Sequence, residues 1–186
     1  MRLFVDYFKG IKMKRLLVLA SLLSGMGVAC AEGYFGGAYG PTHGDIECPT
    51  GASCDKTDAG WKFYMGSKLN DTWAIEAAYI NYGKASAADE TTEVSFRAES
   101  FAVSGVGRFA LTSSLTANGR LGVAYVQAKS SAGGSERQAR PMVGFGIAYA
   151  ASPNVSLTLD ADFTQAKLDG ESATVRLLSA GVMYAY

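Results

Sequence analysis

The residues with the most evident chemistry gather in one Pro/Gly/Thr-rich stretch beside His43, the single histidine of the chain. Cys48 and Cys54 follow it with five residues between them, and Asp55 comes directly after Cys54. A metal site of His43, the cysteines and Asp55 is one interpretation, but zinc sites usually space a cysteine pair by about two to four residues. A disulfide between Cys48 and Cys54 is the other, and an exported chain favours it. We therefore expect a disulfide and no metal or cofactor.

The N-terminus predicts export. Met13-Lys14-Arg15 forms a short basic segment, residues 16–28 are apolar apart from small residues, and Ala29-Cys30-Ala31 fits a cleavage site. This pattern is typical of a secretory signal peptide, and its apolar run is too short for a good membrane span. We predict a signal peptide over residues 1–31, cleaved after Ala31, and one domain over 32–186. Residues 1–12 either extend the signal or precede a true start at Met13.

Cys30 leaves a second interpretation of this segment open. A small residue before the cysteine suits a lipidated N-terminus, whereas Gly27 stands where lipoprotein signals usually carry leucine. After residue 31, acidic residues outnumber basic ones, so nothing indicates a nucleic-acid partner.

From Gly33 onward, extended runs rich in aromatic residues alternate with small polar breaks. The breaks predicted as connections fall at 41–59, 70–72, 86–92, 112–114, 130–135, 152–154 and 169–170. Short and long breaks alternate, as they do in outer-membrane barrels with short turns at one end and longer loops at the other. We therefore predict an all-β fold, an eight-stranded antiparallel up-and-down transmembrane β-barrel.

The predicted strands carry apolar side chains on one side and polar ones on the other. Between 155 and 164, Leu157, Leu159 and Phe163 alternate with Asp160 and Asp162. The last strand is less regular, because Val175 and Leu177 fall on its polar side. A soluble barrel of the lipocalin kind would turn the same apolar residues inward. Aromatic residues near the strand ends favour the membrane barrel instead; they are Trp61, Trp73, Tyr79, Tyr125, Tyr149, Tyr184 and Tyr186.

In such a barrel the charged side chains point into the lumen. The predicted inward set is Lys62, Arg108 and Arg120 with Glu76, Asp160 and Asp162. Since an eight-stranded barrel is just wide enough for side chains to fill it, these charges should pair. The depth of each residue along its strand predicts that Arg120 pairs with Asp160 and that Arg108 pairs with Glu76. We expect a network that plugs a polar lumen, or else a gate whose pairs exchange to admit small ions.

Three stretches carry a resemblance to a known family. Residues 33–40 resemble the first strand of OmpA-like transmembrane domains. The stretch from Cys48 through Cys54 to Lys62 resembles their first loop, and residues 179–186 resemble their closing strand. The resemblance implies an integral protein of the Gram-negative outer membrane, a monomer surrounded by outer-membrane lipid and lipopolysaccharide. Ser179, Gly181, Tyr184 and Tyr186 are similar to the C-terminal signal that the barrel assembly machinery reads. OmpA continues into a peptidoglycan-binding domain, which we do not expect here.

Some barrels of this size are lipid A deacylases or palmitoyltransferases. The deacylases need a histidine base next to a serine nucleophile, and no His-x-Ser occurs near a strand end. His43 with Asp45 offers little of a palmitoyltransferase site, so we predict a solvated loop histidine and no enzyme. The expected role is structural or at the surface, with a small ion pore or an adhesin or phage-receptor barrel as alternatives.

Overall fold

The computed structural model describes residues 32–186 apart from 45–52, 56, 90–91, 131–134 and 169–170; near some of these gaps, including all of β2, it describes only the backbone. The described residues form nine strands: β1 (Gly33–Gly44), β2 (Ser53–Asp55), β3 (Thr57–Lys68), β4 (Trp73–Asp89), β5 (Thr92–Ala110), β6 (Leu115–Ser130), β7 (Ser135–Ala150), β8 (Val155–Leu168) and β9 (Glu171–Ala185). Among these residues, no helix is long and apolar enough to cross a membrane.

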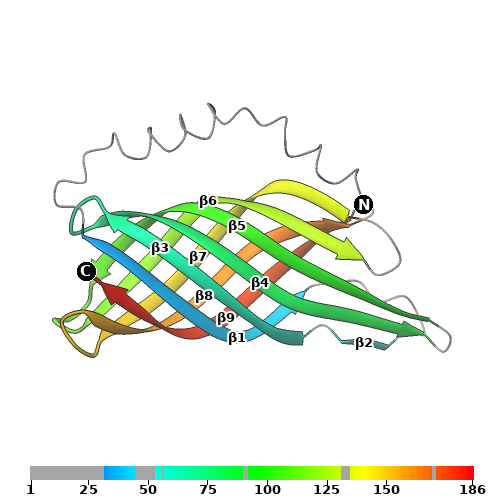
Figure 1. Ribbon diagram of the computed structural model, residues 1–186, viewed down its shortest axis with the longest axis horizontal. Coiled ribbons are helices and arrows are strands. Elements are labelled where there is room, and N and C mark those ends of the chain that lie inside the picture. The colour runs from blue at the N-terminus through cyan, green and yellow to red at the C-terminus, as the bar shows by residue number, and fades with distance from the viewer. Residues whose placement is uncertain (1–31, 45–52, 56, 90–91, 131–134, 169–170) are drawn as a thin grey trace, which may run out of the picture. The chain divides into compact units, whose positions relative to one another are not determined.

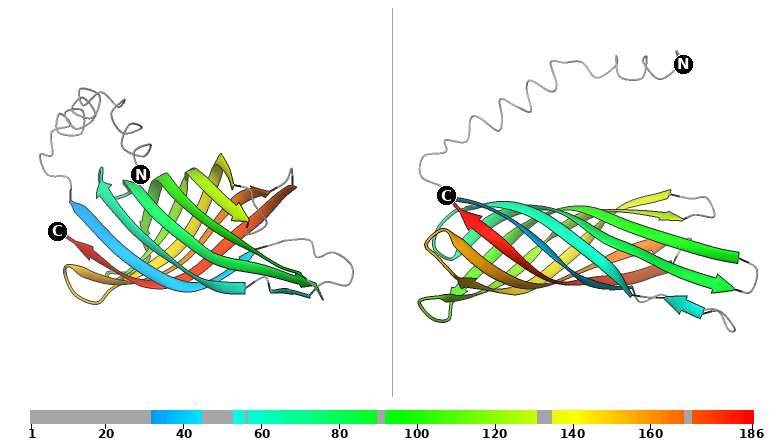
Figure 2. Two further views of the ribbon diagram at one scale, coloured as in Figure 1. Left: turned by 45° about the vertical axis from the view of Figure 1, so that its right-hand side comes forward. Right: turned by 60° about the horizontal axis from the view of Figure 1, so that its bottom comes forward.

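Eight of the strands close into a barrel. Each pairs antiparallel with the next one along the chain, and β9 pairs with β1, where Tyr34 lies opposite Ala185 (Figures 1 and 2). The backbone N–H of Tyr186 donates to the carbonyl of Gly33 at 2.9 Å and extends this seam to the last residue. The prediction of an eight-stranded, all-antiparallel barrel is confirmed. The additional β2 pairs with the outer part of β4.

Three tight connections define one end of the barrel, the turn end, where the C-terminus also lies (Figure 1). In each, a polar side chain accepts a hydrogen bond from the backbone N–H three residues later. The pairs are Asn70 with Trp73 at 2.8 Å, Thr112 with Leu115 at 3.0 Å and Ser152 with Val155 at 3.1 Å. Such Asx and hydroxyl turns hold short hairpins closed. The opposite end is called the loop end below.

The strands reach further toward the loop end than the sequence pattern predicted. Residues 86–89 and Thr92, predicted as part of a loop, continue the β4–β5 ladder up to the pair Asp89 and Thr92. Likewise β1 continues to Gly44 and β3 begins at Thr57, inside the predicted first loop. Pairing satisfies backbone N–H and C=O groups whatever the side chains are, so polar composition alone did not end these strands.

One irregularity interrupts the β4 ladder near the loop end. The register between β4 and β5 shifts between Asn81 and Lys84, and Gly83 has a φ of 74°. A Cβ at Gly83 would lie 2.6 Å from the Asp58 carboxylate, which accepts a hydrogen bond from the N–H of Lys84. Glycine is needed there for both its φ and its lack of a side chain.

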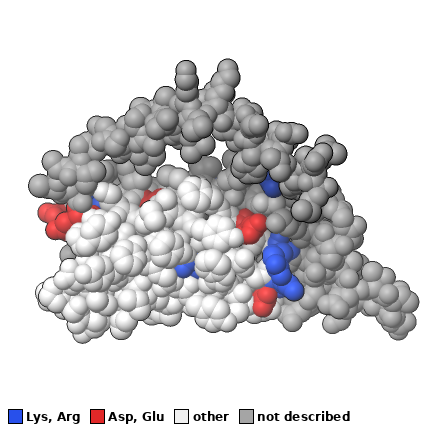
Figure 3. Space-filling view, viewed as in Figure 1, with Lys and Arg blue, Asp and Glu red and all other residues white. Residues whose placement is uncertain are grey.

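The outer surface of the barrel is apolar. Large hydrophobic residues remain strongly exposed, for example Leu121 at 70%, Phe145 at 59% and Phe101 at 55%. In Figure 3 the described part of the face is largely uncharged, with the densest charged side chains toward the loop end. A soluble lipocalin-like barrel would bury these residues, so this surface belongs in lipid.

Aromatic pairs lie near both ends of this apolar surface. Phe35 lies 5.7 Å from Tyr184 and 6.3 Å from Tyr186 between ring centroids at the turn end. Trp61 and Tyr79 lie 5.4 Å apart nearer the loop end. These positions match the interfacial girdles of transmembrane barrels.

Candidate functional site: a buried ion network in the lumen

Five charged residues occupy alternate, inward positions on four strands. Lys62 comes from β3, Glu76 from β4, Arg120 from β6, and Asp160 and Asp162 from β8. All five are at most 5% exposed, and Asp162 is completely buried. The strand period of two places them inside, because their odd-numbered neighbours face outward.

The five side chains form one continuous chain of ion pairs. Lys62 Nζ lies 2.6 Å from Asp162 Oδ2 and 3.0 Å from Asp160 Oδ2. Arg120 donates from Nη1 to Asp160 Oδ1 at 2.8 Å and from Nε to Glu76 Oε1 at 2.9 Å. The chain therefore runs from Asp162 through Lys62, Asp160 and Arg120 to Glu76 and links four strands across the lumen.

Two tyrosines complete the network toward the turn end. Tyr34 of β1 donates from its hydroxyl to Glu76 Oε2 at 3.2 Å. The ring centroid of Tyr64 lies 5.3 Å from Lys62 Nζ and 5.9 Å from Arg120 Cζ, within range of cation–π contact with both. With Tyr34 included, the three neighbouring strands β1, β3 and β4 each contribute a side chain to the network.

The predicted ion pairs are confirmed in part. Arg120 contacts Asp160, but Glu76 pairs with Arg120 rather than with Arg108. In the β4–β5 register Glu76 lies opposite Ser104, and Trp73, next to the turn, lies opposite Gly107, so Arg108 is nearer the turn end than Glu76. Counting residues from each turn missed this offset. Arg108 lines a small cavity of about 20 Å³ below the network, together with Glu76 and Arg120. A cavity of that volume has room for about one water molecule.

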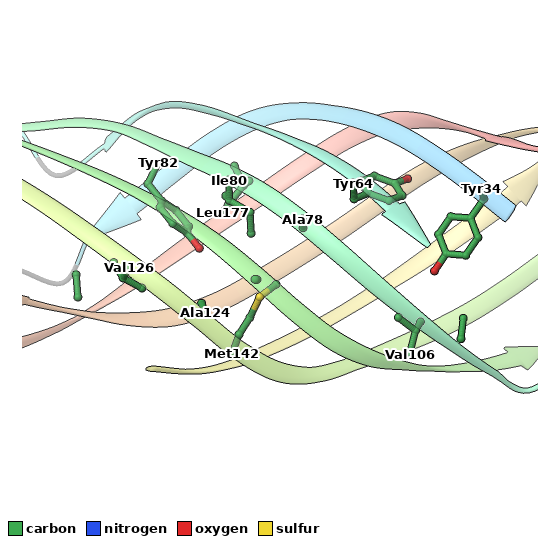
Figure 4. Close-up of a cluster of buried hydrophobic side chains, with 13 residues drawn as sticks. Tyr34, Tyr64, Ala78, Ile80, Tyr82, Val106, Ala124, Val126, Met142 and Leu177 are labelled. Atoms are coloured by element: carbon green, nitrogen blue, oxygen red, sulfur yellow. The ribbon is translucent and has the colours of Figure 1, made fainter. Parts of the chain in front are cut away.

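An apolar layer lies on the loop-end side of the network. Ile80, Tyr82, Val126, Met142 and Leu177 point into the lumen there (Figure 4), and Ile80 and Leu177 are fully buried. The expectation of a polar lumen therefore holds only for part of its length. The signal was present in the sequence, because Leu177 interrupts the polar side of the last strand.

The first-loop residues lie near the loop end or outside the described part of the chain. His43 is in β1 rather than in a loop, and its Nδ1 lies 3.3 Å from Thr57 Oγ1 of β3. Cys48 and Asp45 lie outside the described residues, and Cys54 and Asp55 are in β2, where only the backbone is described. The disulfide therefore stays a prediction. Among the described side chains, no group of three or more His, Cys, Asp or Glu residues could hold a metal ion.

The predicted signal peptide, its cleavage after Ala31 and the lipidation of Cys30 also lie outside the described residues. Directly after them, at the turn end, Lys68 donates a hydrogen bond to the exposed Glu32 carboxylate. This hydrogen bond and the positive charge of Lys68 lower the pKa of Glu32.

The predicted C-terminal signal lies in the closing seam. Ser179 points inward and is buried, while Tyr184 and Tyr186 face outward at the turn end. A Cβ at Gly181 would lie 2.2 Å from the carbonyl oxygen of Gly37 on β1, so glycine allows β9 to approach β1.

Comparison with known proteins agrees with this architecture. A family model described as "OmpA-like transmembrane domain" matches residues 28–186. Ail, the attachment invasion locus protein of Yersinia pestis, is 20% identical with a TM-score of 0.54, covering 84% of this chain and 99% of its own. Neisserial surface protein A is 18% identical with a TM-score of 0.57, covering 82% of this chain and 97% of its own.

A third solved structure is the N-terminal β-barrel domain of Pseudomonas aeruginosa OprF. It is 13% identical with a TM-score of 0.54, covering 83% of this chain and 97% of that domain. Comparison with curated protein sequences finds no match. At these identities the solved structures establish the fold.

Proposed function

Because this chain belongs to the family of OmpA-like transmembrane domains, an outer-membrane β-barrel family, we propose that it is a non-catalytic structural barrel with a closed lumen. In this proposal the turn end faces the periplasm and the loop end faces the exterior, as short turns and longer loops do in such barrels. The assembly machinery would read residues 179–186 as the closing strand is inserted.

The buried ion network is the observation that carries the closed lumen. An ion crossing the barrel would have to separate Lys62 and Arg120 from carboxylates with which they are in direct contact. Removing one partner of a buried pair costs about 3–5 kcal/mol, because the other charge stays buried and unpaired. The apolar layer of Ile80 and Leu177 adds a second barrier that carries no charge to stabilise a passing ion.

Cell fractionation tests the location and the fold together. Unheated samples of the outer-membrane fraction should migrate faster on a denaturing gel than boiled ones, because a closed barrel stays compact until heated. The protein recovered from the soluble periplasmic fraction, or migrating identically before and after heating, would contradict the proposal. Planar-bilayer conductance then separates a closed barrel from the small-pore alternative.

A role in surface binding is the second candidate. The observation that favours it is the length of β4 and β5, at 17 and 19 residues, with β2 added to the outer part of β4. Together they present a strand-built rim at the loop end, where a barrel usually places its recognition surface. Deleting residues 45–55 should reduce host-cell adhesion or phage sensitivity if this rim binds a ligand. Unchanged adhesion and phage sensitivity would contradict surface binding by this rim, and only the structural role would remain.

A further inference from the structure

The outward wall of β1, β7, β8 and β9 contains an apolar hollow. A cavity of about 600 Å³ opens there, walled by Tyr39, Phe145, Ile147, Leu159 and Leu178. A second hollow of about 430 Å³ shares Ile147 and Leu159 and continues past Tyr149 and Leu157 toward the turn end. The two together form one groove along the wall, called the wall groove below.

Strand register explains the wall groove. Ala180 on β9 lies opposite Leu159, and Ala161 on β8 lies opposite Leu178 and Phe145. Each of these alanines thus lies between large neighbours, and because the two alanines are on adjacent strands, they leave a continuous depression. All the outward side chains that line the wall groove are apolar, so the groove favours contact with lipid over contact with water.

A cation stands at the loop-end mouth of the wall groove. From Leu178 toward the loop end, Arg176 is the next outward residue of β9, and it is exposed. Its register partners are His43 on β1 and Phe163 on β8. Among the side chains that the structure describes, no salt bridge engages Arg176. A guanidinium at the edge of an apolar surface is well placed to bind a phosphate.

We propose that the wall groove binds one molecule of lipopolysaccharide, with an acyl chain of its lipid A in the groove and a lipid A phosphate on Arg176. The assignment to lipopolysaccharide rests on the proposed function, which places the loop end and Arg176 at the outer side of the membrane. A second copy of this chain fits the groove less well. A two-fold contact would set hollow against hollow and bring like charges together.

Native mass spectrometry of the purified barrel tests the site, with bisphosphorylated lipid A as the probe. Dephosphorylated lipid A and phosphatidylglycerol serve as the comparison lipids. The wild type should retain one molecule of bisphosphorylated lipid A. The groove-filling double substitution Ala161→Leu with Ala180→Leu should weaken retention about tenfold or more, because the acyl chain loses its space.

Arg176→Gln isolates the phosphate contact. It should weaken retention of the bisphosphorylated lipid about tenfold and leave the dephosphorylated lipid unchanged, because one charge-assisted contact is lost. Ala77→Leu on the outward face of β4 and Arg97→Gln on β5 are the matched controls on the other wall and should have no effect.

Equal lipid A retention by wild type, filled variant and Arg176→Gln would overturn the proposal. So would equal retention of phosphatidylglycerol, or a lipid-free dimer that the filled variant abolishes. The heat-modifiable migration of each variant is recorded alongside. A folded barrel that retains no lipid A contradicts the groove alone, whereas a chain that is never heat-modifiable contradicts the proposed function itself.

Discussion

Arg120 Nη1 donates to Asp160 Oδ1 at 2.8 Å and joins β6 to β8 across the lumen, although β7 separates these strands in the sheet. The same guanidinium holds Glu76 of β4 through Nε. One side chain thus connects three strands that backbone hydrogen bonds do not connect directly. The barrel is held together from inside as well as around its wall.

Loss of this guanidinium should destabilise the barrel strongly. Arg120→Met should lower the free energy of unfolding by about 3–5 kcal/mol, because Glu76 remains buried without its cation and Asp160 keeps only Lys62. Urea unfolding in detergent or lipid, followed by gel migration, measures the change. Arg97→Met, an exposed arginine of β5, is the control and should stay within about 0.5 kcal/mol of wild type. A loss below about 1 kcal/mol for Arg120→Met would mean that water screens the pair.

The apolar layer predicts a contrast between two adjacent leucines. Leu177 is fully buried in the lumen, whereas Leu178 faces outward and is 51% exposed. Leu177→Ala should cost about 2–5 kcal/mol of unfolding free energy because it leaves a cavity in a packed interior. Leu178→Ala, which loses only contact with lipid or detergent, should cost clearly less in the same urea titration. Equal losses would contradict the inward packing of Leu177.

The closing seam predicts a glycine requirement at one position. Gly181→Ala places a methyl group where an ideal Cβ lies 2.2 Å from the Gly37 carbonyl oxygen, so β9 must move away from β1. The heat-modifiable fraction after refolding should fall markedly. At Gly119 a Cβ would meet no atom within 4 Å, so Gly119→Ala should refold like wild type. Matching yields for the two variants would show that the seam tolerates the methyl group.

The last residue should matter for insertion more than its inward neighbours do. Tyr186 is 71% exposed and lies 6.3 Å from the ring of Phe35, within the turn-end girdle. Tyr186→Ser removes an interfacial anchor, and Met183→Ser removes a half-buried inward side chain. The amount of heat-modifiable protein in the outer-membrane fraction should fall more for Tyr186→Ser. The reverse order would argue against an interfacial role for Tyr186.

Alternation along single strands predicted which residues share a face, and the aromatic residues near the strand ends indicated which of the two faces lines the lumen. Asp160 and Asp162 were placed inside because Leu157, Leu159 and Phe163 occupy the other side of the same strand, and the structure agrees. That information is local, since the pleat has a fixed period of two.

The partners across the lumen could not be derived in the same way. Whether Glu76 meets Arg108 or Arg120 depends on the register between neighbouring strands and on the tilt of the barrel, which no single strand encodes. The extension of β4 and β5 was also missed, because it depends on pairing between two polar segments rather than on their composition.

The closed lumen is tested most directly by planar-bilayer conductance of the purified, inserted barrel. Wild type, Glu76→Ala and Asp160→Ala should all insert and none should show discrete conductance steps, because the layer of Ile80 and Leu177 remains in place when a carboxylate is removed. Stable steps from the wild type would contradict the closed lumen and support exchange of ion pairs as a gate. Steps that appear only in a variant would contradict the apolar layer as a second barrier.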